Sequence, residues 1–266
     1  MSQKAGAILL FVIVACFTVL IFGGAQISRH KPPIPGRVVA PTGEVLFTSE
    51  DVALGQRQYL SRGGQQTGSI WGHGAYLAPD WSADSLHRTG LVTAGLRRGL
   101  APDSAAAFTQ ADLTGLPAGE RGRVQAEVAE ELRRNRYDPA TDTLTLSPGQ
   151  AAALPALVAY YTHLFRDGSD AMSIPAGFVT DRTDARALTT FFFWTAWAAG
   201  TNRPGETFTY TANFPHDPLV GNQPLPSALV WSIASVVLLV LGVAIAIFAY
   251  LRMRAKDPDE PVGIAP

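Results

Sequence analysis

The stretch from Ala5 to Ile27, which reads AGAILLFVIVACFTVLIFGGAQI, contains no charged residue and sets the organisation of the whole chain. A second uncharged stretch, SALVWSIASVVLLVLGVAIAIFAYL, runs from Ser227 to Leu251. Each is longer than the roughly 20 residues that a helix needs to cross the hydrocarbon core of a bilayer. The first also exceeds the apolar region of a signal peptide, about 7–15 residues, and no clear cleavage site follows it. The sequence therefore predicts transmembrane helices at residues 5–27 and 227–251, the first of them an uncleaved anchor.

Basic residues beside these stretches predict how the chain is oriented. Three of them directly follow the second stretch: Arg252, Arg254 and Lys256. Because Lys and Arg are enriched on the cytoplasmic side, residues 252–266 are expected to form a cytoplasmic tail, with the N-terminus on the same side. Arg29 and Lys31 oppose this orientation, but a loop of about 190 residues crosses the membrane largely regardless of its charge. Residues 28–226 are therefore predicted to form an extracytoplasmic domain.

The composition limits what this chain can do by itself. The formal net charge is −1, which gives no basic surface for nucleic acid. Cys16 is the single cysteine, which excludes an intrachain disulfide, the CxxCH attachment of a c-type haem and a cysteine-based zinc site. Neither apolar stretch contains a histidine that could ligate a membrane haem. We therefore assign no catalytic, cofactor-binding or metal-ligating residue, and expect an anchored domain with a structural or partner-docking role.

Between the apolar stretches the sequence predicts a mainly helical domain. Residues 31–43 are rich in proline and glycine and are interpreted as an extended linker. Helices are predicted at residues 50–60, from Pro79 onward, at 119–135, from Pro148 onward and at 184–199, with short strands at 45–47, 143–146 and 207–210. The aromatic helix at 184–199 is too short to span a membrane, so it either forms the domain core or lies against the membrane surface.

Residues 62–76 contain five glycines and precede a polar helical face. A phosphate-binding loop would end in Gly-Lys-Ser/Thr, which is missing here, so we predict a folded loop whose backbone needs positive φ angles or a close approach to its neighbours. Asp80, Asp84 and His87 follow at i, i+4 and i+7 and so share one side of a helix. Such a side can ligate a metal ion, but it is more often solvated or in contact with polar groups of a partner.

Three stretches resemble the N-terminal region of quinol-dependent nitric oxide reductases. They are Gly64–Arg88 (GQQTGSIWGHGAYLAPDWSADSLHR), Asn135–Asp138 (NRYD) and Phe191–Asn222 (FFFWTAWAAGTNRPGETFTYTANFPHDPLVGN). The family motif residues are Gly72, His73, Gly74, Ala75, Tyr76, Pro79, Asp80 and Trp81. In that family the region is similar to the small cytochrome c subunit of cytochrome-dependent nitric oxide reductases, where CxxCH precedes this motif. The missing cysteines agree with the quinol-dependent branch.

The resemblance implies a cytochrome-c-like helical domain without haem, anchored in the bacterial inner membrane. It also implies a non-haem part of a quinol-dependent nitric oxide reductase, which reduces two NO to N2O. The family continues into many further membrane spans that hold haem b, haem b3 and non-haem iron, whereas this chain stops soon after Glu260. The catalytic portion is therefore expected on another polypeptide, or missing, with membrane lipid as the other partner. The alternative is a membrane-anchored scaffold or sensor domain without a redox partner.

The segment from Asn202 to Asn222 is the predicted docking region. It contains three prolines, which lack a backbone donor, so we expect that it cannot satisfy its own backbone as helix or sheet. Unsatisfied backbone is costly close to a bilayer, which favours a covering partner. The predicted contacts are Phe208, Tyr210 and Phe214 as apolar anchors, with His216 and Asp217 as hydrogen-bonding groups. The alternative for this segment is a solvated stalk.

Overall fold

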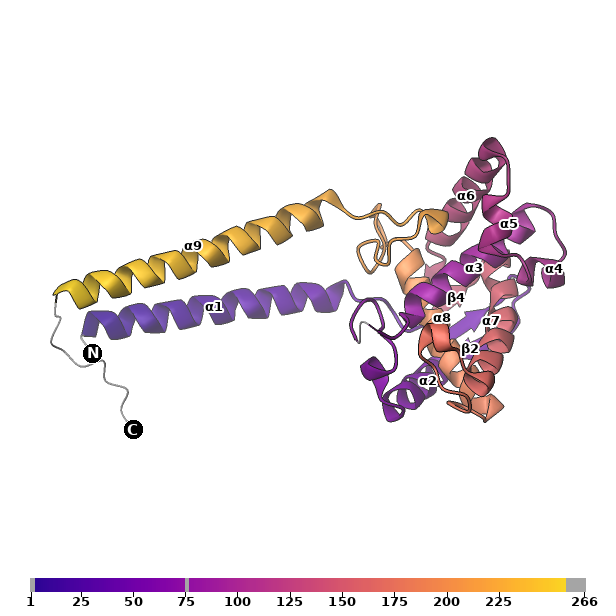
Figure 1. The fold of residues 1–266 in the computed structure, drawn as a ribbon, viewed down its shortest axis with the longest axis horizontal. Helices are drawn as coiled ribbons and strands as arrows, with labels where there is room; N and C mark the ends of the chain where they lie inside the picture. Colours follow the sequence, from indigo (N-terminus) through magenta and orange to yellow (C-terminus); the bar gives the residue numbers. More distant parts are fainter. Residues whose placement is uncertain (1–2, 75–76, 257–266) are drawn as a thin grey trace. The chain divides into compact units, whose positions relative to one another are not determined.

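The computed structural model describes residues 3–74 and 77–256, and the fold is mainly helical (Figure 1). The chain divides into two units, with the boundary between Gln223 and Pro224. The first unit contains helix α1 (Gln3–Arg29) and the whole domain that follows it, and the second contains helix α9 (Pro226–Lys256). The boundaries of α1 and α9 match the predicted apolar helices to within a few residues, except at the C-terminal end of α9.

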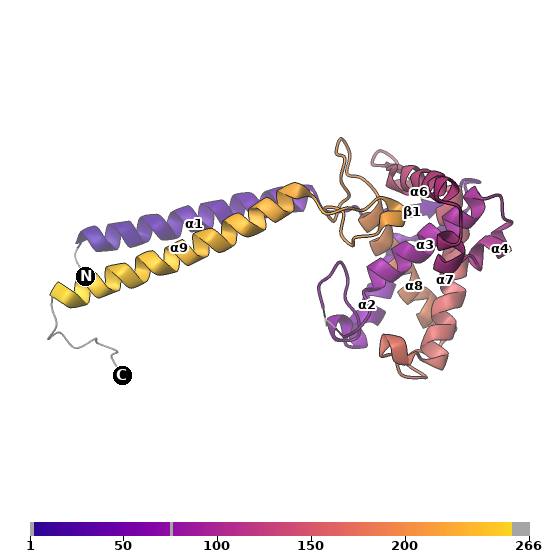
Figure 2. The ribbon, with the colours of Figure 1, turned by 45° about the horizontal axis from the view of Figure 1, so that its top comes forward.

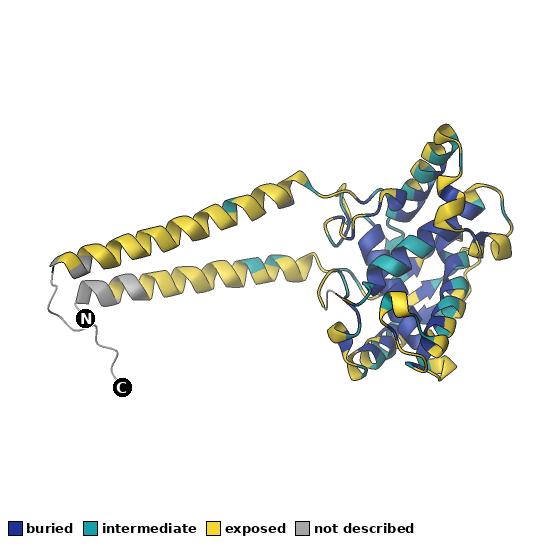
Figure 3. Cartoon of the chain, viewed as in Figure 1, coloured by how far each residue is buried: buried dark blue, intermediate teal, exposed yellow. Residues whose placement is uncertain are grey.

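Helices α1 and α9 both have the length and apolar composition of membrane spans. The spanning portions are Leu10–Arg29 and Leu229–Arg252, and the described side chains along them are almost all exposed (Figure 3). The second portion has 24 residues, which at 1.5 Å per residue is about 36 Å, more than the roughly 30 Å of a hydrocarbon core. Apolar side chains without protein neighbours are stable when lipid surrounds them, so the chain is a membrane protein.

Four short strands of the domain form a small sheet. Its strands are β1 (Arg37–Val39), β2 (Val45–Thr48), β3 (Tyr137–Asp138) and β4 (Thr143–Thr145), in the order β2-β1-β4-β3. The prediction that residues 31–43 form only a linker is wrong, because β1 pairs parallel with β4 and antiparallel with β2. Strand β1 forms because the side chain of Val38 is buried in the core. Its backbone pairs with that of Leu144 in β4, which lies 106 residues further along the chain.

Two capping boxes start helices where the sequence predicts them. Helix α2 (Ser49–Ser61) begins after Thr48, which exchanges hydrogen bonds with Asp51. Helix α7 (Pro148–Asp167) begins after Ser147, which does the same with Gln150 and has proline at the first helical position. In a capping box two otherwise unpaired backbone N–H groups find side-chain partners, so short-range sequence is enough to locate the helix start.

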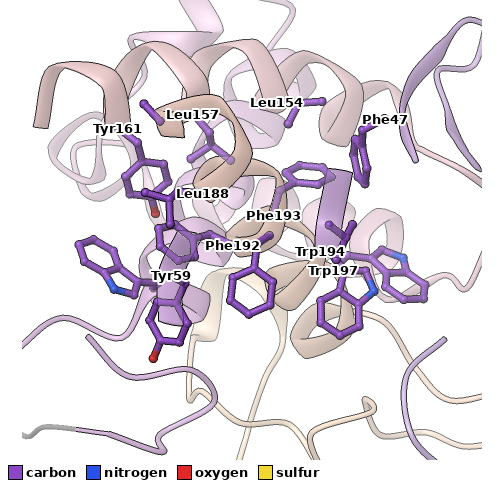
Figure 4. Packing of buried hydrophobic residues seen from close by; sticks show 14 of the residues in the cluster. Phe47, Tyr59, Leu154, Leu157, Tyr161, Leu188, Phe192, Phe193, Trp194 and Trp197 are labelled. Atoms are coloured by element: carbon purple, nitrogen blue, oxygen red, sulfur yellow. The ribbon is translucent and has the colours of Figure 1, made fainter. Parts of the chain in front are cut away.

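Helix α8 (Arg182–Gly200) is the centre of the domain. Its residues from Leu188 to Gly200 are all buried, and it contacts α2, α7 and α3 (Trp81–Arg97). The aromatic side chains of α8 therefore form the core, which decides between the two sequence-based alternatives for this helix (Figure 4). Gly55 of α2 allows the close approach, because a Cβ there would clash with the carbonyl oxygen of Ala187.

A second apolar cluster lies under helix α6 (Ala118–Arg133). Val124, Val128 and Leu132 are buried as their i, i+4, i+8 spacing predicts. The short helices α4 (Pro102–Ala106) and α5 (Gln110–Thr114), which the sequence analysis did not predict, connect α3 to α6. Three one-turn 3₁₀ helices complete the fold: η1 (Gly64–Gln66), η2 (Asp170–Met172) and η3 (Pro218–Val220).

Candidate docking surface

Asp80 fixes the glycine-rich loop to the start of α3. Its Oδ1 accepts a hydrogen bond from the backbone N–H of Ala83 at 2.8 Å, which caps the helix. Its Oδ2 accepts from the N–H of Gly72 at 2.6 Å and from the hydroxyl of Ser69 at 2.8 Å. Gly72 has a φ of 77°, as predicted for this loop, because a residue without Cβ adopts that conformation at little cost. Two motif residues, Ala75 and Tyr76, lie outside the described residues.

The base of the same loop packs on the aromatic core. The hydroxyl of Tyr59 donates to the carbonyl oxygen of Gly68 at 2.7 Å, and a Cβ on Gly68 would clash with the indole of Trp81. Trp81 in turn stacks on Phe192 with ring centroids 5.0 Å apart. Burial, and secondarily the negative charge of Asp80, raise the pKa of Tyr59 to about 12, so this phenol remains a hydrogen-bond donor at neutral pH.

The three residues Asp80, Asp84 and His87 do not form a metal site. Asp80 caps α3, while Asp84 accepts hydrogen bonds from Arg88 and from the hydroxyl of Tyr161 at 2.8 Å. Burial first, and then the charge of Asp84, hold the pKa of Tyr161 well above its usual value. His87 pairs instead with Asp217, the residue that precedes the 3₁₀ helix η3. Within residues 3–74 and 77–256, no three His, Cys, Asp or Glu side chains gather as metal ligands would.

The aromatic core leaves little free space. The core cavity between α3, α6, α7 and α8 measures about 10 Å³, which is room for about one water molecule. Trp81, Tyr161, Phe165 and Phe192 fill the neighbouring space with ring centroids 5.0–6.5 Å apart. The chain's single cysteine, Cys16, lies in α1, so the domain has no thiol for covalent attachment.

Arg133 organises the segment that leads to α9. One of its guanidinium nitrogens donates to the carbonyl oxygen of Thr207 at 2.7 Å and to the side-chain oxygen of Asn213 at 3.1 Å. The other donates to the carbonyl oxygen of Gly221 at 3.1 Å and to the side-chain oxygen of Asn222 at 3.0 Å. A single side chain therefore holds both ends of residues 207–222 to helix α6.

Two asparagines complete this network. The amide nitrogen of Asn222 donates to the carbonyl oxygens of Ala199 and Pro215, at 2.9 and 3.1 Å. The amide nitrogen of Asn213 donates to the carbonyl oxygen of Gln223 at 3.1 Å. The expectation that this segment needs a partner for its backbone is therefore wrong, because side chains supply the missing hydrogen bonds. The predicted strand at 207–210 is also absent, and residues 202 and 209 form only an isolated bridge.

Two of the five predicted docking residues are inside the domain. Tyr210 is 8% exposed, its ring packs on Trp197, and its hydroxyl accepts a hydrogen bond from Asn135 at 3.0 Å. Asp217 is also buried, where it accepts from the backbone N–H of Leu219 and lies 3.0 Å from the Nδ1 of His87. Both side chains are used by the domain itself, and little of either is exposed for a partner.

The other three docking residues reach the surface to different extents. Phe208 is half-buried beneath the guanidinium of Arg203, at 5.4 Å from its ring centroid. Phe214 is 43% exposed, and His216, two residues on, is exposed as well. The ring of Phe214 lies directly over Gly72, where a Cβ would be 2.8 Å from it. The glycine-rich loop and the 202–223 segment therefore meet at one place.

We call the residues at this meeting point the docking surface: Trp71, Gly72, His73, Phe214 and His216. Trp71 is half-buried, and its indole N–H donates to the carbonyl oxygen of Thr195 at 2.9 Å, so the loop is tied to α8. His73 is exposed beside it. Apart from the one-turn helices η1 and η3, the described part of the loop and the 202–223 segment are irregular ribbons (Figure 2). Sequence analysis missed the contribution of the loop, although a tryptophan among glycines was a signal for it.

The chain is a mainly helical domain joined to two helices with the composition of membrane spans, and residues 30–223 contain no cysteine that could attach a haem covalently. The family model for the cytochrome c-like domain of the nitric oxide reductase chain NorB matches residues 35–216. Because the match covers more than half of the chain, the protein belongs to this family. A comparison with curated proteins finds no match. The predicted resemblance and fold class are therefore confirmed, and the chain is a nitric oxide reductase-related component.

Proposed function

We propose that this chain is the non-haem part of a quinol-dependent nitric oxide reductase and has a structural and docking role. The observation that carries the proposal is the exposed aromatic side chain of Phe214, where the glycine-rich loop meets the 202–223 segment. Phe214 remains 43% exposed although it packs on Gly72, and aromatic side chains are frequent at the centres of protein interfaces. The family match supports association with other nitric oxide reductase subunits.

The chemistry belongs to the partner in this proposal. Haem b, haem b3 and non-haem iron are held by a multi-span catalytic chain, which takes electrons from a membrane quinol and reduces two NO to N2O. The present chain contributes its membrane helices and the docking surface. Aromatic side chains fill the domain core, and this favours a structural role for the domain over a role as a redox centre.

The proposed orientation places both termini in the cytoplasm and residues 28–226 outside it, with residues 252–266 as a cytoplasmic tail. Arg252, at the end of the second membrane span, supports this direction. In a chain with Cys16→Ala and Ser173→Cys, we expect an impermeant thiol reagent to label intact spheroplasts from outside. Labelling at position 173 only after the cytoplasmic side is opened would contradict the orientation, and a cysteine added in the tail provides the opposite control.

The docking role predicts that two neighbouring aromatic residues respond differently to truncation. Phe214→Ala should weaken co-purification with the catalytic chain about 30-fold, since a buried aromatic hot spot contributes roughly 2 kcal/mol or more. Its effect on the melting temperature of the domain should be small, because the side chain is half outside the fold. Tyr210→Ala should do the opposite and lower the melting temperature, because Tyr210 packs on Trp197.

Leu60→Ala is the matched control, because Leu60 is an exposed apolar residue at the end of α2 and is not one of the docking-surface residues. It should change neither quantity. Unchanged co-purification for Phe214→Ala would remove the docking surface from the proposal. A chain that never co-purifies with a multi-span partner would instead support a membrane-anchored scaffold or sensor domain.

A further inference from the structure

An open groove lies between the glycine-rich loop and the connection from α7 to α8. One wall is made by residues 66–67 and 77–78, and the other by residues 173–175 and 178. Its volume is about 550 Å³, within the range of about 300–1,000 Å³ that is usual for small-molecule sites. The groove contains none of the docking-surface residues, and the proposed function does not use it.

Among the described residues, the lining of the groove is uncharged and has no group that binds iron. Its residues are Gln66, Thr67, Leu77, Ala78, Ser173, Ile174, Pro175 and Phe178. None of them is acidic, basic, histidine, cysteine or methionine. A charged ligand would lose its hydration there without gaining an opposite charge, so the lining selects for neutral molecules.

The floor of the groove is fixed to the domain core. Ile174 is buried, and the ring of Phe178 packs on Phe165 with centroids 5.6 Å apart. The backbone N–H of Ser169 donates to the carbonyl oxygen of Ile174 at 2.8 Å, and the N–H of Ile174 returns a hydrogen bond to Ser169 at 3.0 Å. The apolar wall at 173–178 is therefore a rigid surface that does not have to be ordered when a ligand binds.

Leu77 forms the opposite wall and is 90% exposed. Burying such a side chain is worth about 1.5–3 kcal/mol, and the fold leaves this stabilisation unused. A ligand that fills the groove would cover Leu77 and the exposed face of the 173–178 wall at the same time. The preferred ligand is therefore apolar as well as neutral.

We propose that the groove binds a hydrocarbon chain, of the fatty-acyl or isoprenoid kind, drawn from the surrounding membrane. The neutral apolar lining and the volume support this class of ligand. The short connection between helix α1 and the domain supports the membrane as the source of this ligand. The carbonyl oxygen of Pro33 accepts a hydrogen bond from the indole of Trp194 at 2.9 Å, which ties the start of the domain to its core. Pro33 is four residues beyond the end of α1, so at most about 14 Å of chain separates the domain from that helix.

The test uses the full chain in lipid nanodiscs and a neutral long-chain alcohol that carries a photoactivatable diazirine. After illumination, labelled peptides are identified by mass spectrometry, which separates groove adducts from those on the membrane helices. We expect adducts on the peptides that contain residues 77–78 and 173–178. Leu77→Asp should reduce them at least 10-fold, because it places a charge on the rim, while Leu60→Asp should leave them unchanged.

Competition distinguishes the two kinds of hydrocarbon ligand. Excess hexadecanol displaces the probe from a site for fatty-acyl chains, and excess geranylgeraniol displaces it from a site for isoprenoid chains. Ala78→Phe places an uncharged ring in the groove and should also reduce the groove adducts. If Ala78→Phe fails to fold, the comparison of Leu77→Asp with the wild type alone tests the proposal. Absence of groove adducts, or equal labelling of the wild type and Leu77→Asp, would overturn the proposal.

Discussion

Trp81→Ala should lower the free energy of unfolding of the domain by about 3–5 kcal/mol, the usual cost of removing a large aromatic side chain from a core. Trp81 is 1% exposed and contacts α7 and α8 at once, through its stacking on Phe192 and its edge contacts with Tyr161 and Phe165. It also fills the space that the missing Cβ of Gly68 leaves open. Its removal would leave a cavity at the point where the glycine-rich loop joins the core.

The measurement is denaturant unfolding of the full chain in detergent, followed by far-ultraviolet circular dichroism. Trp231→Ala is the matched control, because Trp231 lies in α9 and is 75% exposed, with no core around it. This control should leave the midpoint of the domain transition unchanged. A loss below about 1 kcal/mol for Trp81→Ala would mean that the loop and core collapse around the space, contrary to the close packing that the structure shows.

Glu131→Ala is expected to cost about 2–3 kcal/mol. The Glu131 side chain is 3% exposed, and its two carboxylate oxygens have different partners. Oε1 accepts from the backbone N–H of Gly149 at 2.8 Å, at the start of α7, and Oε2 accepts from the Nε of Arg97 at 2.8 Å, at the end of α3. Removing the carboxylate leaves the Gly149 N–H buried without a partner and Arg97 without its counter-charge. We take the lower end of the range for broken ion pairs because Arg97 is partly exposed.

Glu131→Gln separates the two contributions. The amide oxygen can still accept from Gly149, so this variant should lose less stability than Glu131→Ala, and the difference measures the hydrogen bond at the start of α7. Glu127→Ala is the control, because Glu127 pairs with Arg123 on the exposed side of α6 and such pairs contribute about 0.3–0.5 kcal/mol. Equal losses in Glu131→Ala and Glu127→Ala would show that the buried pair contributes nothing beyond a surface pair.

The features that the sequence alone determined are those with short-range causes. The apolar stretches at 5–27 and 227–251 predict membrane helices because a bilayer demands uncharged runs of sufficient length, and α1 and α9 follow them. The starts of α2 and α7 depend on a side chain and a backbone N–H three residues apart. The sequence offers Thr48 or Ser49 as the cap of α2, of which the structure uses Thr48, and Ser147 with Gln150 has the spacing of a capping box at the start of α7. The stripe Val124, Val128 and Leu132 likewise predicts which side of α6 is buried.

The features that only the tertiary structure decided depend on contacts between distant residues. Tyr210 looks like an exposed anchor in a proline-rich segment until Trp197 and Asn135 are seen to enclose it. Residues 207–222 look unable to satisfy their backbone until Arg133 arrives from α6. Such pairings are set by which helices pack together, because a side chain's local sequence does not contain the partner that will bury it or bind it. Local pattern therefore placed the helices, and packing decided which of their aromatic and polar side chains remain at the surface for a partner.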